Sequence, residues 1–166
     1  MDAERATTEP WLEHPLPARR APDGRSPGVN GLKIFRDRLY ATNSDRTLTA
    51  RVPLSPEDRP AGPPEVFVDD LLCDDLAFSE AGDLCLATHP LSSVVRISPG
   101  GEIAVLGDAR QGLTGATAVA FGRGPSAGWL YAVATGGVFA PPPGGPVPAE
   151  VVRLRVDAAG APVLRR

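Results

Sequence analysis

The chain repeats one pattern of short strands three times, and this repeat limits its fold more than any other feature. Each copy holds a short apolar run, a turn, a second apolar run and a third run that carries an arginine. The first apolar runs begin at Leu32, Leu76 and Val119, which stand 44 and 43 positions apart. A period of about 40–45 residues made of four short strands is typical of a β-propeller blade. The pattern therefore predicts an all-β chain of radial antiparallel sheets.

We predict about three four-stranded blades, at approximately 28–70, 71–112 and 113–166. The fourth strands are expected at 65–68, 102–106 and, weakly, 162–164. Propellers usually hold about four to eight blades, so three blades do not close a ring. The chain is therefore expected to be a truncated propeller or fragment. Residues 1–27 lack the pattern and are predicted to be an irregular segment, the tail of a preceding blade.

Composition excludes several classes of function. The chain has 17 Lys and Arg against 20 Asp and Glu, and this weakly acidic balance gives no reason to expect a nucleic-acid or membrane partner. No apolar run approaches the roughly 18 residues of a membrane span, and the polar start shows no signal peptide, so a cytoplasmic location is expected. Cys73 and Cys85 are predicted to be small buried side chains rather than a disulfide.

The residue before each inner strand is the first candidate for a binding or catalytic site. Asn30, Asp74 and Thr117 hold this position in the three copies. Inner strands of a propeller line a central channel, so equivalent positions of adjacent blades point to one place. An amide carbonyl and a carboxylate are the hard oxygen ligands that suit calcium or magnesium. On this interpretation Asp74 faces the channel, while Asp75 lies past the turn.

A purely structural interpretation of the same residues stays open. Asn30-Gly31 is a common turn dipeptide, because both residues tolerate a positive φ. The Asp74 side chain is equally suited to bond the next backbone amides in an Asx-turn. Spacing alone does not separate these turns from a metal site.

Several motifs resemble one known family. The stretches "GVNGLKI", "CDDLAFSEAGDLCLATHP", "VVRISPGGE" and "GATAVAFGR" resemble the SMP-30/gluconolactonase, or regucalcin-like, family over roughly residues 28–160. This resemblance implies a six-bladed propeller, of which the chain matches the second half. It also implies one divalent metal, commonly calcium and in some members zinc or magnesium, with Asn30 and Asp74 as ligands. Many members hydrolyse lactones or related esters, which makes Asp74 a candidate general base and a lactone or sugar-derived molecule the expected substrate.

The chain also departs from that family's pattern. No glutamate here matches the ligand that the family takes from its first blade, and the early blades that contact substrate are absent. The expected function is therefore metal-dependent hydrolysis of a lactone or small ester in the complete fold. The alternative is a propeller that binds sugars or proteins, or acts as a scaffold, without catalysis. A half-ring that self-associates, or a remnant without function, is a third interpretation.

Three further residues are candidates for substrate contact. His89 and Asn43 end the second strands of their blades, at an end of the sheet near the expected channel mouth. A histidine there is suited to bond a substrate or shuttle a proton, although a loop-packing role is also open. The hydroxyl of Thr117 is suited to bond a water or substrate, or to cap a turn.

Overall fold

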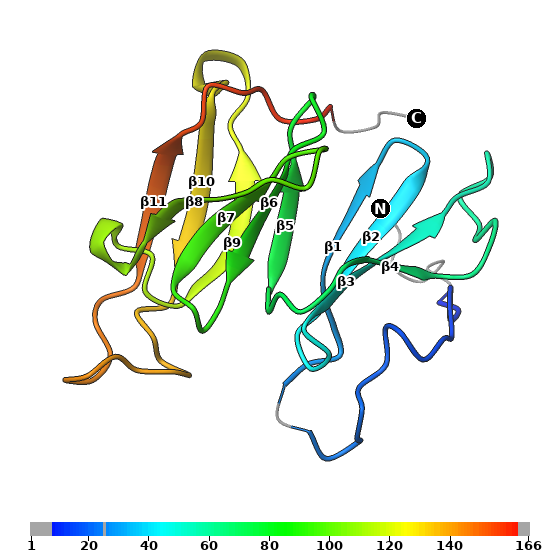
Figure 1. The fold of residues 1–166 in the computed structure, drawn as a ribbon, viewed down its shortest axis with the longest axis horizontal. Helices are drawn as coiled ribbons and strands as arrows, with labels where there is room; N and C mark the ends of the chain where they lie inside the picture. The colour runs from blue at the N-terminus through cyan, green and yellow to red at the C-terminus, as the bar shows by residue number, and fades with distance from the viewer. Residues whose placement is uncertain (1–7, 25, 163–166) are drawn as a thin grey trace.

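The computed structural model describes residues 8–24 and 26–162 and folds them into three antiparallel sheets (Figure 1). The first sheet holds β1 (Val29–Phe35), β2 (Arg38–Asn43), β3 (Leu48–Pro53) and β4 (Glu65–Val68). The second holds β5 (Asp75–Phe78), β6 (Leu84–Thr88), β7 (Ser93–Ile97) and β8 (Ile103–Asp108). The third holds β9 (Ala116–Phe121), β10 (Trp129–Ala134) and β11 (Glu150–Arg155). Two short 3-10 helices are η2 (Ala109–Gln111) and η3 (Gly124–Ser126).

The sheets stand beside one another like the blades of a propeller, which confirms the predicted fold class (Figure 1). Consecutive strands pair within each sheet, so every sheet is an up-and-down meander that starts at its inner strand. The inner strands are neighbours, because β1 packs beside β5 and β5 packs beside β9. These three strands form one wall of a channel. None of the helices among the described residues is long and apolar enough to cross a membrane.

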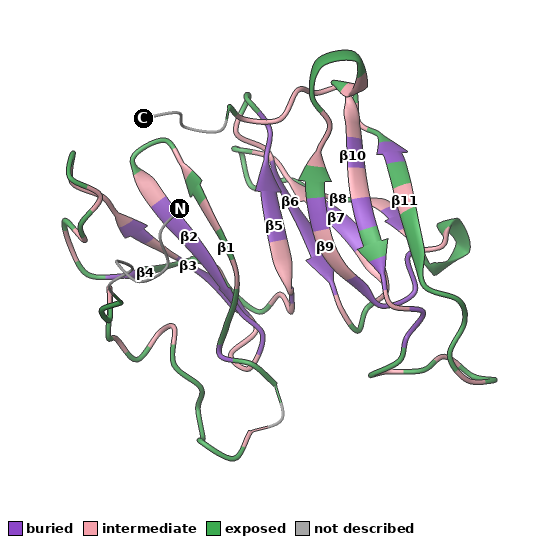
Figure 2. Cartoon of the chain, turned by 180° about the vertical axis from the view of Figure 1, so that it is seen from behind, coloured by how far each residue is buried: buried purple, intermediate pink, exposed green. Residues whose placement is uncertain are grey.

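The core lies between the sheets, on both faces of the second one. One apolar cluster, with Leu76, Leu86 and Phe78, faces the first sheet, and another, with Cys85 and Ala87, faces the third. Every residue of β6 is buried as a result (Figure 2). This burial on two faces explains why the apolar pattern of the sequence alternates imperfectly. Cys73 and Cys85 are both buried and free, as the sequence predicted.

The described part of the N-terminal segment covers the outer face of the first sheet. Trp11 and Leu12 pack on the cluster formed by Leu39, Ala41 and Val52. The Trp11 indole also donates a hydrogen bond of 2.9 Å to the backbone carbonyl of residue 58. Residues 8–24 contain no strand. The segment shields an apolar face that a neighbouring blade covers in a closed ring.

The third sheet has three strands among the described residues. The fourth strand, predicted at 162–164, falls mostly outside them, because only Pro162 is described. The chain just before it returns to the second sheet, where Ala161 N donates to Phe78 O at 2.8 Å and Gly160 forms a bridge with Ser79. This crossing lies over the channel at the end where β5 finishes.

Candidate functional site

A hollow of about 540 Å³ lies at the end of the channel where the inner strands begin. Asn30 of β1, Asp74 directly before β5 and Thr117 of β9 all line it. The structure therefore brings together the three positions that the repeat singled out. The volume lies within the usual range of small-molecule pockets, about 300–1,000 Å³. His89 lines the same hollow from the loop after β6.

Ser44 connects the side chains of Asn30 and Asp74. Asn30 Nδ2 donates to Ser44 Oγ at 3.1 Å, and that hydroxyl lies 3.3 Å from Asp74 Oδ1. The Ser44 hydroxyl also lies 3.0 Å from the carbonyl oxygen of Cys73, so its proton has two acceptors within reach. An amide and a carboxylate side chain from adjacent blades thus line one hollow.

The environment of Asp74 changes its proton affinity. Partial burial raises the pKa of the Asp74 carboxyl above its ordinary value, and the nearby carboxylate of Asp75 raises it further. His89 and the hydrogen bonds from Ser44 and Asn30 act in the opposite direction. A carboxylate with a raised pKa accepts a proton more readily, which suits a general base.

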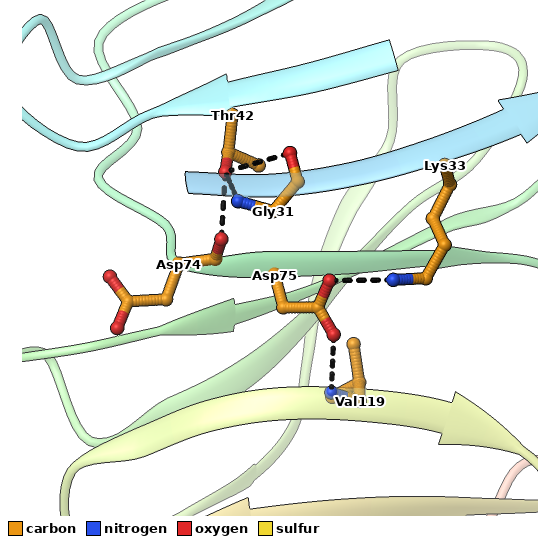
Figure 3. Close-up of polar contacts among 6 residues, drawn as sticks. All are labelled: Gly31, Lys33, Thr42, Asp74, Asp75 and Val119. Carbon is orange, nitrogen blue, oxygen red and sulfur yellow. Dashed lines mark hydrogen bonds and ion pairs between the residues drawn. The ribbon is translucent and has the colours of Figure 1, made fainter. Parts of the chain in front are cut away.

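A close backbone approach holds β1 against Asp74. A Cβ at Gly31 would lie 2.5 Å from the carbonyl oxygen of Asp74 and 2.6 Å from Cα of Asp75, so the position requires glycine for space. The Thr42 hydroxyl accepts from Gly31 N and donates to the Asp74 carbonyl, both at 2.7 Å (Figure 3). Asn30 and Gly31 lie within β1 at a β-bulge rather than in a turn. The turn interpretation of this dipeptide is therefore wrong.

Asp75 begins β5 and bonds to both neighbouring inner strands, which corrects the expectation that it lies past the turn. Its Oδ1 accepts from Lys33 Nζ of β1 at 2.8 Å, and its Oδ2 accepts from Val119 N of β9 at 3.2 Å (Figure 3). One carboxylate therefore joins the inner strands of all three sheets. The sequence signal for this role was Lys33, a single cation inside an otherwise apolar inner strand.

His89 and Phe139 also line the hollow. Nε2 of His89 is buried and has no hydrogen-bond partner among the described residues. The Phe139 ring stands edge-on to the imidazole, with the ring centroids 6.0 Å apart and an angle of 74° between planes. Phe139 comes from the loop between β10 and β11, which the sequence analysis did not connect to the site. The hydroxyl of Thr117 is only loosely held, 3.5 Å from the carbonyl of Val133.

Asn43 does not line this hollow. It is 1% exposed, and its Nδ2 donates to the carbonyls of Leu16 at 2.7 Å and Ala18 at 3.0 Å. Its Oδ1 accepts from Arg46 N at 3.0 Å. The side chain fastens the N-terminal segment to the first sheet, and these hydrogen bonds use both of its polar atoms.

The residues present fit a divalent cation in part. An amide oxygen and a carboxylate are suitable donors for calcium or magnesium. Within residues 8–24 and 26–162, however, no three His, Cys, Asp or Glu side chains come together in a group suited to hold a metal ion. The described chain therefore offers Asn30 and Asp74 as two ligands, and a calcium or magnesium site requires further ligands.

A second hollow, of about 490 Å³, lies toward the other end of the inner strands. Its lining is mostly apolar and comes from β1, β5, β9 and the crossing at 160–162. Lys33 and Arg123 are the charged residues among the described residues that line it. It holds none of the candidate site residues, so the chemistry is concentrated at the first hollow.

Comparison with known proteins supports the fold. The sequence matches no protein-family model and no curated protein. In structure, 80% of the chain aligns with 47% of a luciferin-regenerating enzyme, with a TM-score of 0.62 and 17% identity. The same share aligns with 47% of regucalcin from Agrobacterium tumefaciens strain C58, a calcium-binding protein, with a TM-score of 0.59 and 21% identity. A streptogramin B lyase aligns with a TM-score of 0.50 and 15% identity, over 79% of this chain and 41% of that one.

The chain spans just under half the length of these solved structures. The order and pairing of the three described sheets are those of consecutive propeller blades. Identities this low establish the fold alone. By its fold, the chain is a set of β-propeller blades similar to those of these solved structures.

Proposed function

We propose that the protein is a divalent-metal-dependent hydrolase that acts on a lactone or small carboxylic ester, with calcium as the expected metal. One observation carries the proposal. Asn30 and Asp74, from adjacent blades, line one hollow and are linked through Ser44. The likeness in fold to a calcium-binding regucalcin supports calcium over the other metals.

Each residue of the hollow has a distinct role in this proposal. Asn30 and Asp74 hold the cation together with ligands from outside the described residues. The cation, when bound, supplies a Lewis acid for the substrate carbonyl and its developing oxyanion. Ser44 fixes the two ligand side chains relative to each other. Asp74 is also proposed to take a proton from an attacking water.

The test compares metal binding with turnover in variants of the full-length protein. Titration calorimetry with Ca²⁺, Mg²⁺ and Zn²⁺ measures affinity, and hydrolysis of a lactone panel is followed with and without a chelator. We expect Asp74→Ala to lose metal binding and to lower kcat/KM by roughly 100-fold or more, the usual contribution of a general base. Asp37→Ala is the matched control, because its side chain is 76% exposed in the turn after β1.

Asn30 offers a second, more conservative comparison. Asn30→Asp keeps an oxygen ligand and should retain metal binding, whereas Asn30→Leu should lose it. Full hydrolysis in Asp74→Ala, or hydrolysis that survives the chelator, would refute the proposal. Saturable binding of a small molecule without turnover would instead support the non-catalytic binding module.

A further inference from the structure

The loop between β10 and β11 holds Phe139 in place over the hollow. Gly136 and Gly137 both have left-handed backbone conformations, with φ of 73° and 79°. A Cβ at Gly136 would collide with the carbonyl oxygen of Val147. The base of the loop is fastened by hydrogen bonds from Gly136 N to Thr114 O at 3.0 Å and from Val147 N to Gly136 O at 2.9 Å. The chain thus reverses direction sharply and presents Phe139 at the rim.

Phe139 is far more exposed than an aromatic side chain used for packing. It is 81% exposed, the largest value among the exposed large hydrophobic residues of the described chain. Its one recorded ring contact is the edge-to-face contact with His89, itself a lining residue. An aromatic ring held at the rim of a small hollow offers its free surface to an apolar group of a ligand.

The hollow has both polar and apolar lining. Ser26, Asn30, Ser44, Asp74 and Thr117 are polar, and Asn30 and Asp74 are the proposed metal ligands. Leu72, Pro90, Phe139 and Ala140 add apolar surface beside the imidazole of His89. None of the described residues that line the hollow is a lysine or arginine. The apolar side chains offer no hydrogen-bond partner to a hydroxyl or phosphate group of a substrate substituent.

We infer that the substrate carries an aryl or branched alkyl substituent next to its lactone or ester group. This inference rests on the proposed hydrolase function and specifies its substrate class. The substituent packs against Phe139, beside the imidazole of His89. The carbonyl group then lies on the side of Asn30 and Asp74. Phe139 determines specificity and takes no part in the chemistry.

The test separates binding from turnover with two pairs of probes. γ-Phenyl-γ-butyrolactone and unsubstituted γ-butyrolactone report hydrolysis in the presence of Ca²⁺. The corresponding lactams are hydrolysed far less readily and report equilibrium affinity in titration calorimetry. We expect the phenyl lactam to bind more tightly than the parent lactam to the wild-type protein. Phe139→Ala should reduce this preference roughly threefold to tenfold, the usual value of one aromatic contact.

Two further variants make the result specific. Ile103→Ala removes another exposed apolar side chain, 63% exposed on β8 and outside the hollow, and should leave the preference unchanged. His89→Phe keeps an aromatic ring beside Phe139 and should also leave the preference unchanged. Circular dichroism checks that the variants are folded.

The possible outcomes separate this inference from the function on which it rests. Equal binding of the two lactams, no binding of either one, or a phenyl preference that survives Phe139→Ala overturns the inference. If one of these results is found but hydrolysis is metal-dependent, the hydrolase proposal stands and the inference about the substituent falls. A phenyl preference that depends on Phe139, without hydrolysis of either lactone, supports the binding inference and refutes the hydrolase.

Discussion

Removing the carboxylate of Asp75 should destabilise the arrangement of the three blades. Asp75 accepts a hydrogen bond from Lys33 Nζ at 2.8 Å and one from Val119 N at 3.2 Å. These partners belong to the inner strands of the first and third sheets, and Asp75 begins the inner strand of the second. The carboxylate is the polar contact that joins all three, so its loss affects the contacts between blades more than the pairing within a blade.

The magnitude follows from the exposure of each partner. The side chain of Asp75 is 18% exposed and that of Lys33 is 41% exposed, so solvent screens the ion pair and it contributes at most about 1 kcal/mol. The hydrogen bond from a backbone amide to a charged acceptor contributes about 1.5–3 kcal/mol. Asp75→Ala should therefore lower the free energy of unfolding by about 2–4 kcal/mol. Asp75→Asn keeps an acceptor for Val119 N and should cost about 1 kcal/mol.

Urea denaturation followed by circular dichroism measures these differences through the midpoint and the slope. Asp37→Ala, which removes a carboxylate that is 76% exposed, should change stability by less than about 0.5 kcal/mol. A double-mutant cycle with Lys33→Met isolates the ion pair, and its coupling energy should decrease in 1 M NaCl. If Asp75→Ala is as stable as the Asp37→Ala control, the reasoning fails.

Two other predictions concern packing and buried thiols. Gly31→Ala should destabilise the protein by about 1–3 kcal/mol, because its Cβ would lie 2.5 Å from the Asp74 carbonyl oxygen, and thermal denaturation measures this loss. Gly101→Ala is the comparison: a Cβ there meets nothing within 4 Å, so this variant reports the effect of backbone conformation alone. Burial raises the pKa of Cys73 to about 11 and that of Cys85 to about 12, from 9.0. The folded state then holds more protons than the unfolded state above pH 9, so the free energy of unfolding should fall as pH rises from about 9 toward 12. In a Cys73→Ala, Cys85→Ala variant it should fall less steeply. Urea titrations at pH 8, 9 and 10 measure this free energy, and an equal decrease with pH in both proteins would contradict the prediction.

The strands could be predicted because each is a short apolar run bounded by turn residues. The second apolar runs of the later two copies, at 84–88 and 130–133, correspond to β6 and β10 within one residue at either end. Burial of both faces of the second sheet was also visible in advance, in its imperfect alternation of apolar and polar residues. These features depend on local composition and on a repeat, both of which the chain itself carries.

The N-terminal segment could not be predicted in the same way. Trp11 packs on the first sheet through contacts with residues about 30 to 40 positions away, and no periodic pattern marks the segment. Asn43 shows the same limitation, since its likeness in position to His89 suggested a site residue. In the structure it fastens this segment, because a buried amide requires partners and Leu16 and Ala18 provide them.

The sequence by itself determined the three-fold repeat, the order of the strands and the placement of Asn30, Asp74 and Thr117 at equivalent ends of the inner strands. Only the tertiary structure decided what Asp75 and Phe139 do. Successive side chains of a strand point in opposite directions, so one residue of uncertainty at the start of β5 exchanges the roles of Asp74 and Asp75. Phe139 lies 50 positions beyond His89 in a loop without periodicity. Its place beside the imidazole depends on the packing of the third blade against the second.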